Sequence, residues 1–138
     1  MNPGKAFYPT ILFLASDSHI RRIISKALDS GGYSVLTASD IGGAVDCLKN
    51  CTPDLLMVRH YTESISGHDA AMYLRRMCPG IPVLIVGGII DDGGLENREI
   101  LQGFEIFPKP FEAAALLEKV KNVLAKHPPR TNAAHDSA

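Results

Sequence analysis

The chain has 138 residues, of which 46% are hydrophobic and 21% charged, a composition that suits one folded domain and excludes a disordered segment. Its 14 basic and 15 acidic residues give a formal net charge of -1, so no overall field favours nucleic acid or an anionic membrane surface. The longest uninterrupted apolar runs, such as residues 11–15, are far shorter than the roughly 20 residues of a membrane-spanning helix. We expect neither direct nucleic-acid binding nor a membrane segment.

The cysteines and histidines show no metal-binding pattern. Cys47, Cys51 and Cys78 form an odd set without a CxxC motif, which argues against a disulfide framework and favours a reducing, cytoplasmic setting. The histidines are scattered, without carboxylate or cysteine partners at ligand spacing, so we expect them on the surface. They are His19, His60, His68, His127 and His135.

The chain alternates short apolar runs with stretches of helical periodicity. In chain order, we predict a strand over residues 11–14, a helix over 20–28, a strand over 33–37, a helix over 41–48, a strand over 54–58, a helix over 70–77, a strand over 82–86, a helix over 95–101, a strand over 105–107 and a helix over 111–124. The helix over 95–101 follows a glycine-rich turn, so we expect it to be short and mobile.

Continuous apolar strands that alternate with helices indicate a parallel sheet covered on both faces. We therefore predict a three-layer α/β fold, a doubly wound five-stranded parallel sheet with right-handed crossovers. Residues 1–126 form the predicted domain, and residues 127–138, which lack apolar periodicity, form a flexible C-terminal tail or linker.

In an open parallel sheet, ligands bind where the strands end at their carboxyl termini. The predicted loops at that edge include residues 15–17, 39–40, 59–61, 87–88 and 108–110. They contain no nucleophile paired with a base, so we do not expect an enzyme.

Several strings in this order resemble the receiver domain of bacterial two-component response regulators, over residues 11–124. They are Pro53-Asp54-Leu55-Leu56-Met57-Val58, Gly67, Ile81-Pro82-Val83-Leu84-Ile85 and Lys109-Pro110-Phe111. The resemblance implies a flavodoxin-like fold of the receiver type and a role in signal transduction through a phosphorelay.

The resemblance also locates a phosphoacceptor pocket. In the family, an acidic pair after the first strand and an aspartate ending the third strand hold Mg²⁺, and that aspartate accepts the phosphoryl group. A hydroxyl after the fourth strand and a lysine bind the phosphoryl oxygens. Here the acidic pair falls on Ala15 and Ser16, the aspartate on Arg59 and the hydroxyl on Gly87, while Lys109 alone is kept. The resemblance therefore implies an atypical, degenerate variant, a pseudo-receiver.

Elementary chemistry agrees with this reading of the pocket. Mg²⁺ requires oxygen ligands, chiefly carboxylates, which an alanine methyl and a guanidinium cannot supply. Arg59 is permanently charged and cannot accept a phosphoryl group. We expect the Mg²⁺ site to be lost and no cofactor to be bound.

Asp17 has three readings. It can cap the following helix, form an ion pair with Arg59, or act as a residual metal ligand. Two functional alternatives also stay open. One is a receiver phosphorylated at an unconventional residue, Asp17 or His60, and the other is an anion-sensing module that uses Arg59 and Lys109.

The family's aromatic switch residue, three positions before the lysine, falls on Ile106, so the usual relay from the pocket should be altered. By resemblance, the partner surface would lie on the fourth helix, fifth strand and fifth helix. Its candidate residues are Glu96, Arg98, Glu99, Gln102, Glu118, Lys119 and Lys121. The expected partners are a histidine kinase, an effector domain, another regulator or a second copy of the chain.

Overall fold

The computed structural model describes residues 9–59, 66–86, 104–107 and 112–126. Five parallel strands form one sheet in the order β2-β1-β3-β4-β5. The strands are β1 (Thr10–Leu14), β2 (Ser34–Ala38), β3 (Leu55–Arg59), β4 (Val83–Val86) and β5 (Glu105–Phe107). The helices are α1 (Ser18–Ser30), α2 (Ile41–Asn50), α3 (Gly67–Arg75) and α5 (Ala113–Lys126). The predicted helix over 95–101 and the predicted tail over 127–138 lie outside the described residues.

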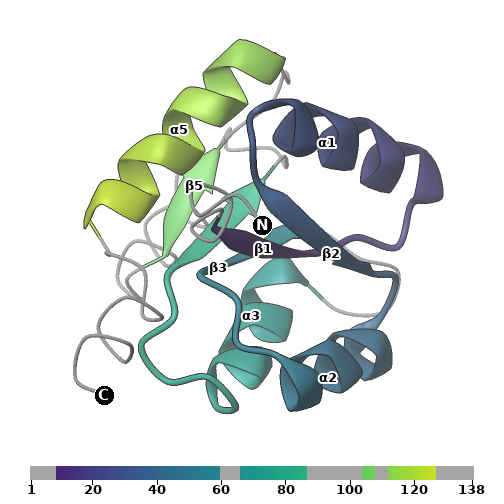
Figure 1. Cartoon of the computed structure of the whole chain (residues 1–138). Coiled ribbons are helices and arrows are strands. Elements are labelled where there is room, and N and C mark those ends of the chain that lie inside the picture. The colour runs from purple at the N-terminus through teal and green to yellow at the C-terminus, as the bar shows by residue number, and fades with distance from the viewer. Residues whose placement is uncertain (1–8, 60–65, 87–103, 108–111, 127–138) are drawn as a thin grey trace, which may run out of the picture.

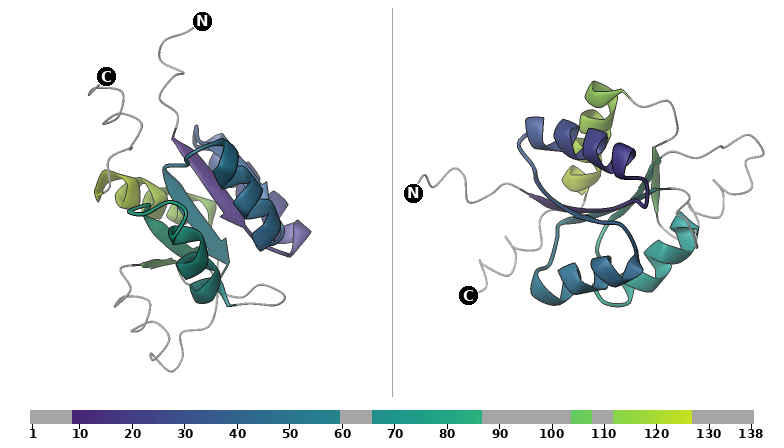
Figure 2. Two further views of the ribbon diagram at one scale, coloured as in Figure 1. Left: turned by 90° about the horizontal axis from the view of Figure 1, so that it is seen from below. Right: turned by 90° about the vertical axis from the view of Figure 1, so that its right-hand side faces the viewer.

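Helices cover both faces of the sheet. Figures 1 and 2 show α1 and α5 on one face and α2 and α3 on the other. This arrangement confirms the predicted parallel sheet with helices on both faces. In the described part of the chain, no helix is long and apolar enough to cross a membrane.

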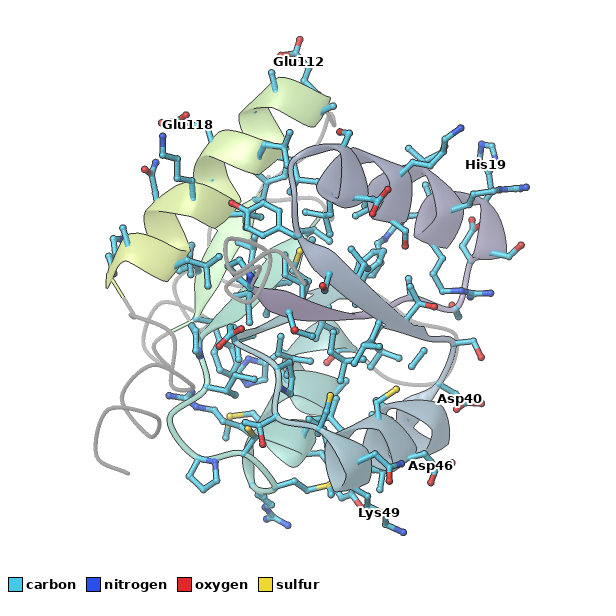
Figure 3. All side chains as sticks on the ribbon, in the orientation of Figure 1. His19, Asp40, Asp46, Lys49, Glu112 and Glu118 are labelled. Carbon is cyan, nitrogen blue, oxygen red and sulfur yellow. The ribbon has the colours of Figure 1, made fainter. Side chains whose placement is uncertain are left out.

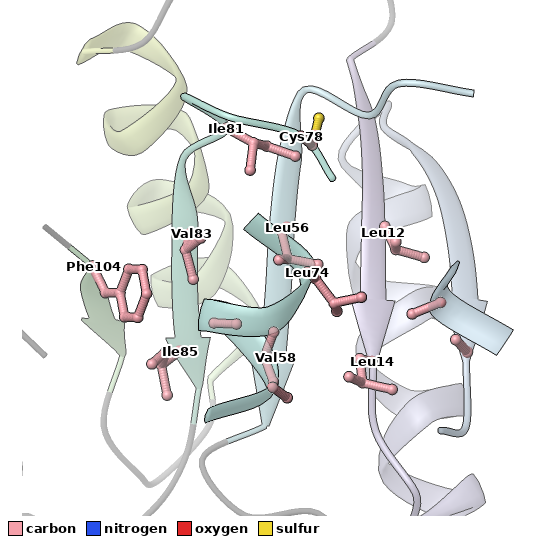
Figure 4. Close-up of a cluster of buried hydrophobic side chains, with 14 residues drawn as sticks. Leu12, Leu14, Leu56, Val58, Leu74, Cys78, Ile81, Val83, Ile85 and Phe104 are labelled. Atoms are coloured by element: carbon pink, nitrogen blue, oxygen red, sulfur yellow. The ribbon is translucent and has the colours of Figure 1, made fainter. Parts of the chain in front are cut away.

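Each face of the sheet carries its own core. Leu12, Leu14 and Val58 belong to the cluster beneath α2 and α3, which Figure 4 shows in close-up. Their neighbours Phe13 and Met57 belong to the cluster beneath α1 and α5. Successive side chains of a strand point to opposite faces, so both sets must be apolar when both faces are covered. This explains why β1 and β3 are continuous apolar runs.

Two glycines end α1 for different reasons. Gly32 has φ of 95°, a left-handed conformation that side chains rarely adopt. A Cβ atom on Gly31 would lie 2.6 Å from a methyl carbon of Leu117 on α5. The pair of glycines therefore turns the chain into β2 and lets α5 approach α1 closely.

His68 lies in the first turn of α3 and is buried, with 7% of its surface exposed. Its ring packs edge-on against Phe104, with ring centroids 5.6 Å apart. The expectation that the histidines lie on the surface is therefore wrong for His68. The cause is a contact with a residue 36 positions away in the sequence (104 − 68), which local patterning does not reveal.

A reciprocal pair of hydrogen bonds joins the starts of β1 and β3. The backbone N–H of Asp54 donates to the Thr10 carbonyl at 2.7 Å, and the Thr10 N–H donates to Oδ2 of the Asp54 carboxylate at 2.9 Å. Asp54 is buried, with 6% of its surface exposed. The aspartate before β3 thus has a structural role, and it aligns the two central strands.

We predict that Asp54→Ala lowers the free energy of unfolding by about 1–3 kcal/mol, because the partly buried Thr10 N–H loses its acceptor. Asp54→Asn keeps a side-chain oxygen at the same distance from the backbone and should cost clearly less. Urea denaturation of the two variants and the wild type measures the difference. Equal losses in the two variants would show that this hydrogen bond does not stabilise the fold.

Candidate functional site at the carboxyl edge of the sheet

The strand register decides which residues meet at the carboxyl edge. Leu14 of β1 pairs with Val58 of β3, and Val58 pairs with Ile85 of β4. The next residues along, Ala15 and Arg59, therefore stand at the same edge on neighbouring strands. The structure thus brings together the two described positions at which the sequence departs most clearly from a metal-binding pocket. Gly87 and Lys109 lie outside the described residues.

Ala15 is part of the core. It has no exposed surface, and its methyl group belongs to the cluster beneath α1 and α5. Its backbone N–H donates to the carbonyl of Ala38 at the end of β2, 3.0 Å away. Ser16, the next residue, is half-buried. The loop after β1 therefore begins with an apolar side chain, where a metal site would require a carboxylate.

Asp17 caps α1, as one of its three readings predicted. Its Oδ1 accepts hydrogen bonds from the backbone N–H groups of His19, at 2.8 Å, and Ile20, at 3.3 Å. Figure 3 labels His19 at this end of α1. The bonds from Ile20 and His19 are the main reason that the pKa of the Asp17 carboxyl lies below its ordinary value of 3.8.

The positive charge of Arg59 also lowers the pKa of Asp17, by less than the backbone bonds and the charge of His19 do. Arg59 thus acts electrostatically on the loop after β1. This attraction is consistent with the predicted ion pair, which stays a hypothesis. Arg59 itself is half-buried at the end of β3.

Arg21 is a feature of this edge that the sequence patterns did not single out. Its Nη1 donates to the backbone carbonyls of Ala15, at 2.8 Å, and Ser16, at 3.4 Å. The guanidinium therefore links the first turns of α1 to the loop that follows β1. The position of Arg21 in the sequence could have indicated this contact, because Arg21 lies four residues after the helix cap and within reach of the preceding loop.

The edge offers hydrogen-bond donors and positive charge. Arg21 and Arg59 each bring a guanidinium, which carries five N–H donors and no acceptor. Two carbonyl oxygens of the loop after β1 already accept from Arg21. Among the described residues, no group of three or more His, Cys, Asp or Glu side chains could hold a metal ion. The described side chains suit an anion far better than a cation.

The candidate partner surface is described only in part. Glu118 and Lys121 are exposed on α5, and Figure 3 shows Glu118 on the side of α5 away from the sheet. Lys119 is less available, because its ammonium contacts the Glu105 carboxylate at 3.1 Å. Lys126 contacts the other oxygen of Glu105, also at 3.1 Å. These two lysines hold the pKa of Glu105 below its usual 4.5, although partial burial acts in the opposite direction.

The remaining predicted residues of that surface, Glu96, Arg98, Glu99 and Gln102, lie outside the described part of the chain. Ile106, the predicted switch position, is the central residue of β5, and its backbone pairs with Ile85. Nothing described therefore tests the altered relay, which stays a prediction.

The lowered pKa of Asp17 predicts a pH dependence of stability. Since the carboxyl titrates lower in the folded chain than in the unfolded one, the charged cap stabilises the fold fully above 3.8 and loses that effect as the pH falls through the folded-state pKa. Asp17→Asn keeps a capping oxygen without the charge. The wild type should exceed this variant in unfolding free energy near neutral pH, and the difference should vanish in acid.

Chemical denaturation over a series of pH values measures this difference. Asp29→Asn, which removes one negative charge at the other end of α1, serves as the control for net charge. A wild-type advantage that persists in strong acid would contradict the assigned role of the Asp17 charge.

Comparison with known proteins agrees with this geometry. A family model described as the response regulator receiver domain matches residues 11–121. The phosphate regulon transcriptional regulatory protein PhoB of Pseudomonas aeruginosa is 29% identical over 127 residues, which cover 87% of this chain and 53% of PhoB. The response regulator MprA of Mycobacterium avium is 26% identical over 133 residues, covering 89% of this chain and 54% of MprA. The chain thus spans about half the length of these curated relatives.

Solved structures show the same fold. A structure of the Vibrio cholerae chemotaxis protein CheY4 superposes with a TM-score of 0.76 at 21% identity, covering 85% of this chain and 99% of CheY4. This likeness confirms the flavodoxin-like fold of the receiver type. Together with the family match over most of the chain, it confirms the resemblance that the sequence strings suggested. The chain belongs to the response regulator receiver domain family, whose members act in two-component signalling.

Proposed function

We propose that this chain is a pseudo-receiver, which keeps the receiver fold, accepts no phosphoryl group and signals by binding another protein. The observation that carries the proposal is the placement of Arg59. It ends β3 beside the buried Ala15. The resemblance to the family assigns the phosphoacceptor aspartate to this position. A guanidinium is neither a nucleophile nor a metal ligand near neutral pH, so this edge lacks the group that the reaction requires.

The described residues do not fit Mg²⁺. The ion prefers octahedral coordination by oxygen and usually binds through one or two carboxylates. Ala15 presents a methyl group, and the carbonyls of Ala15 and Ser16 face the Arg21 guanidinium. A divalent cation would also be repelled by two guanidiniums. These features support a receiver that works without Mg²⁺ or another cofactor.

Asp17 is poorly suited as a substitute acceptor. Its Oδ1 accepts two backbone N–H groups, which stabilise the carboxylate and reduce its reactivity toward a phosphodonor. Attack through this oxygen would leave the first turn of α1 without its cap. This geometry weighs against phosphorylation at Asp17. His60, the other suggested acceptor, lies outside the described residues.

A binding role follows if the phosphoryl chemistry is absent. We infer a non-enzymatic domain over residues 1–126 with a protein partner, which could be a histidine kinase, an effector domain, another regulator or a second copy. Glu118 and Lys121 on α5 are the exposed charges that the structure contributes to the proposed surface. Cys47, Cys51 and Cys78 form no disulfide among the described residues, which supports a reducing, cytoplasmic setting.

The test is intact mass spectrometry after incubation with acetyl phosphate and Mg²⁺. We expect no mass gain in the wild type, while a receiver that retains the acidic pair and the aspartate gains one phosphoryl group. Arg59→Asp should also stay unmodified, because Ala15 still supplies no oxygen ligand.

A labile, Mg²⁺-dependent gain in the wild type would overturn the proposal and require a search for the modified residue. A gain confined to Arg59→Asp would show that Arg59 alone blocks the reaction and that the loss of the acidic pair is tolerated.

A further inference from the structure

We propose that a cleft between α1 and the edge strand β2 binds a phosphorylated small molecule. The cleft has a volume of about 310 Å³ and is lined by Ser18, Arg21, Arg22, Ser25 and Thr37. It lies outside the degenerate phosphoacceptor pocket, and its ligand would bind without covalent chemistry. The inference does not depend on the proposed function, since Arg21 is the one lining residue that also contacts the loop after β1, and the absence of a phosphoacceptor does not affect binding in the cleft.

The lining residues come together for a simple geometric reason. Ser18, Arg21, Arg22 and Ser25 follow each other at spacings of three, one and three residues along α1, so they form one stripe on the helix. Thr37 is exposed on β2, two residues after Val35, which packs in the core beneath α1. Alternation along the strand therefore places Thr37 on the α1 side of the sheet.

The chemistry of the lining matches a phosphoryl group. Among the described residues, two arginines and three hydroxyl side chains line the cleft, and no carboxylate does. Guanidinium forks bind phosphate oxygens with two parallel hydrogen bonds, and these charge-assisted bonds are among the strongest that proteins form. Serine and threonine hydroxyls can donate to the remaining oxygens.

Arg21 is already held in place. Its Nη1 donates to the carbonyls of Ala15 and Ser16, which fixes the guanidinium at the end of β1. The other two nitrogens still carry N–H donors for a ligand. A side chain that is ordered before binding loses less conformational entropy when the ligand arrives.

Ser25 lines the cleft, but its hydroxyl oxygen is not accessible to solvent. Its Oγ is buried and has no hydrogen-bond partner among the described residues. A buried hydroxyl without a partner is unfavourable, and such groups in native structures call for an explanation. Because solvent does not reach this Oγ, a ligand in the cleft would bond to it only after the side chain rotates.

The size and the lining of the cleft also limit the class of ligand that can bind. The volume of the cleft is at the lower end of the range for small-molecule sites. None of the described lining side chains is aromatic, so they offer no surface on which a nucleobase could stack. A sugar phosphate fits these features, with its phosphoryl group on the arginines and its hydroxyls toward Ser18 and Thr37.

The site can be tested by amide chemical shifts in two-dimensional ¹H–¹⁵N spectra. The probes are inorganic phosphate and ribose 5-phosphate, with ribose and with chloride at matched ionic strength as controls. We expect saturable shifts in the amides of residues 18–25 and of Thr37 with both phosphates, stronger with the sugar phosphate, and no such shifts with the controls. Saturation by inorganic phosphate with no gain from the sugar would support a phosphate site and overturn the sugar phosphate assignment.

Arg22→Ala provides the decisive variant, because Arg22 is exposed and its loss should leave the fold intact. Affinity for ribose 5-phosphate should fall by about tenfold or more, since a charge-assisted hydrogen bond is lost. Arg76→Ala removes an equal charge from the far face of the sheet and should bind as the wild type does. Thr37→Val, which keeps the side-chain volume, should bind more weakly.

Three results would overturn the proposal. The shifts could fail to saturate, they could persist unchanged in Arg22→Ala, or they could centre on Arg59 and disappear in Arg59→Ala. The last result would place the anion at the carboxyl edge of the sheet, where the sequence suggested an anion-sensing alternative.

Discussion

The register of the three central parallel strands is the constraint on which the site depends. Leu14, Val58 and Ile85 lie side by side across β1, β3 and β4. A slip of one residue would exchange the side chains that face α1 and α5 for those that face α2 and α3. Both clusters are closely packed and differ in composition, so the slip would disrupt two cores at once. The register in turn sets Ala15 next to the end of β3, where Arg59 stands.

As a result, polar groups at the carboxyl edge of the sheet form hydrogen bonds with one another. The carbonyls after β1 accept from Arg21, and the Asp17 carboxylate accepts the first amides of α1. Phosphoryl transfer in a receiver instead needs carboxylates at this edge whose oxygens are available to bind a cation. Arg21 also lines the cleft on the outer side of α1, so it links that cleft to the end of β1. A ligand bound there would act on the same loop that Arg59 influences electrostatically.

The sequence was sufficient wherever local patterning carries the information. Buried strands were recognisable as apolar runs. The departures at Ala15 and Arg59 followed from the resemblance to the receiver family, which places the acidic pair and the phosphoacceptor at these positions. The contacts of Asp54 with Thr10 and of His68 with Phe104 could not be predicted, since they join residues distant in sequence. The pairing of Lys119 with Glu105 was missed for the same reason, because helix periodicity marks the lysine as solvent-facing without showing the carboxylate on the neighbouring strand.

A receiver that keeps its fold but has lost its metal chemistry should bind no divalent cation at the carboxyl edge of the sheet. Paramagnetic broadening by Mn²⁺, which substitutes for Mg²⁺ at oxygen-ligand sites, measures this binding. Amide signals of Ala15, Ser16 and Arg59 would report on an ion at the carboxyl edge. We expect no saturable broadening of these signals, while a receiver with its acidic pair intact loses the equivalent ones. Saturable broadening centred on these amides would show that the edge still holds a divalent cation and that the metal chemistry is not lost.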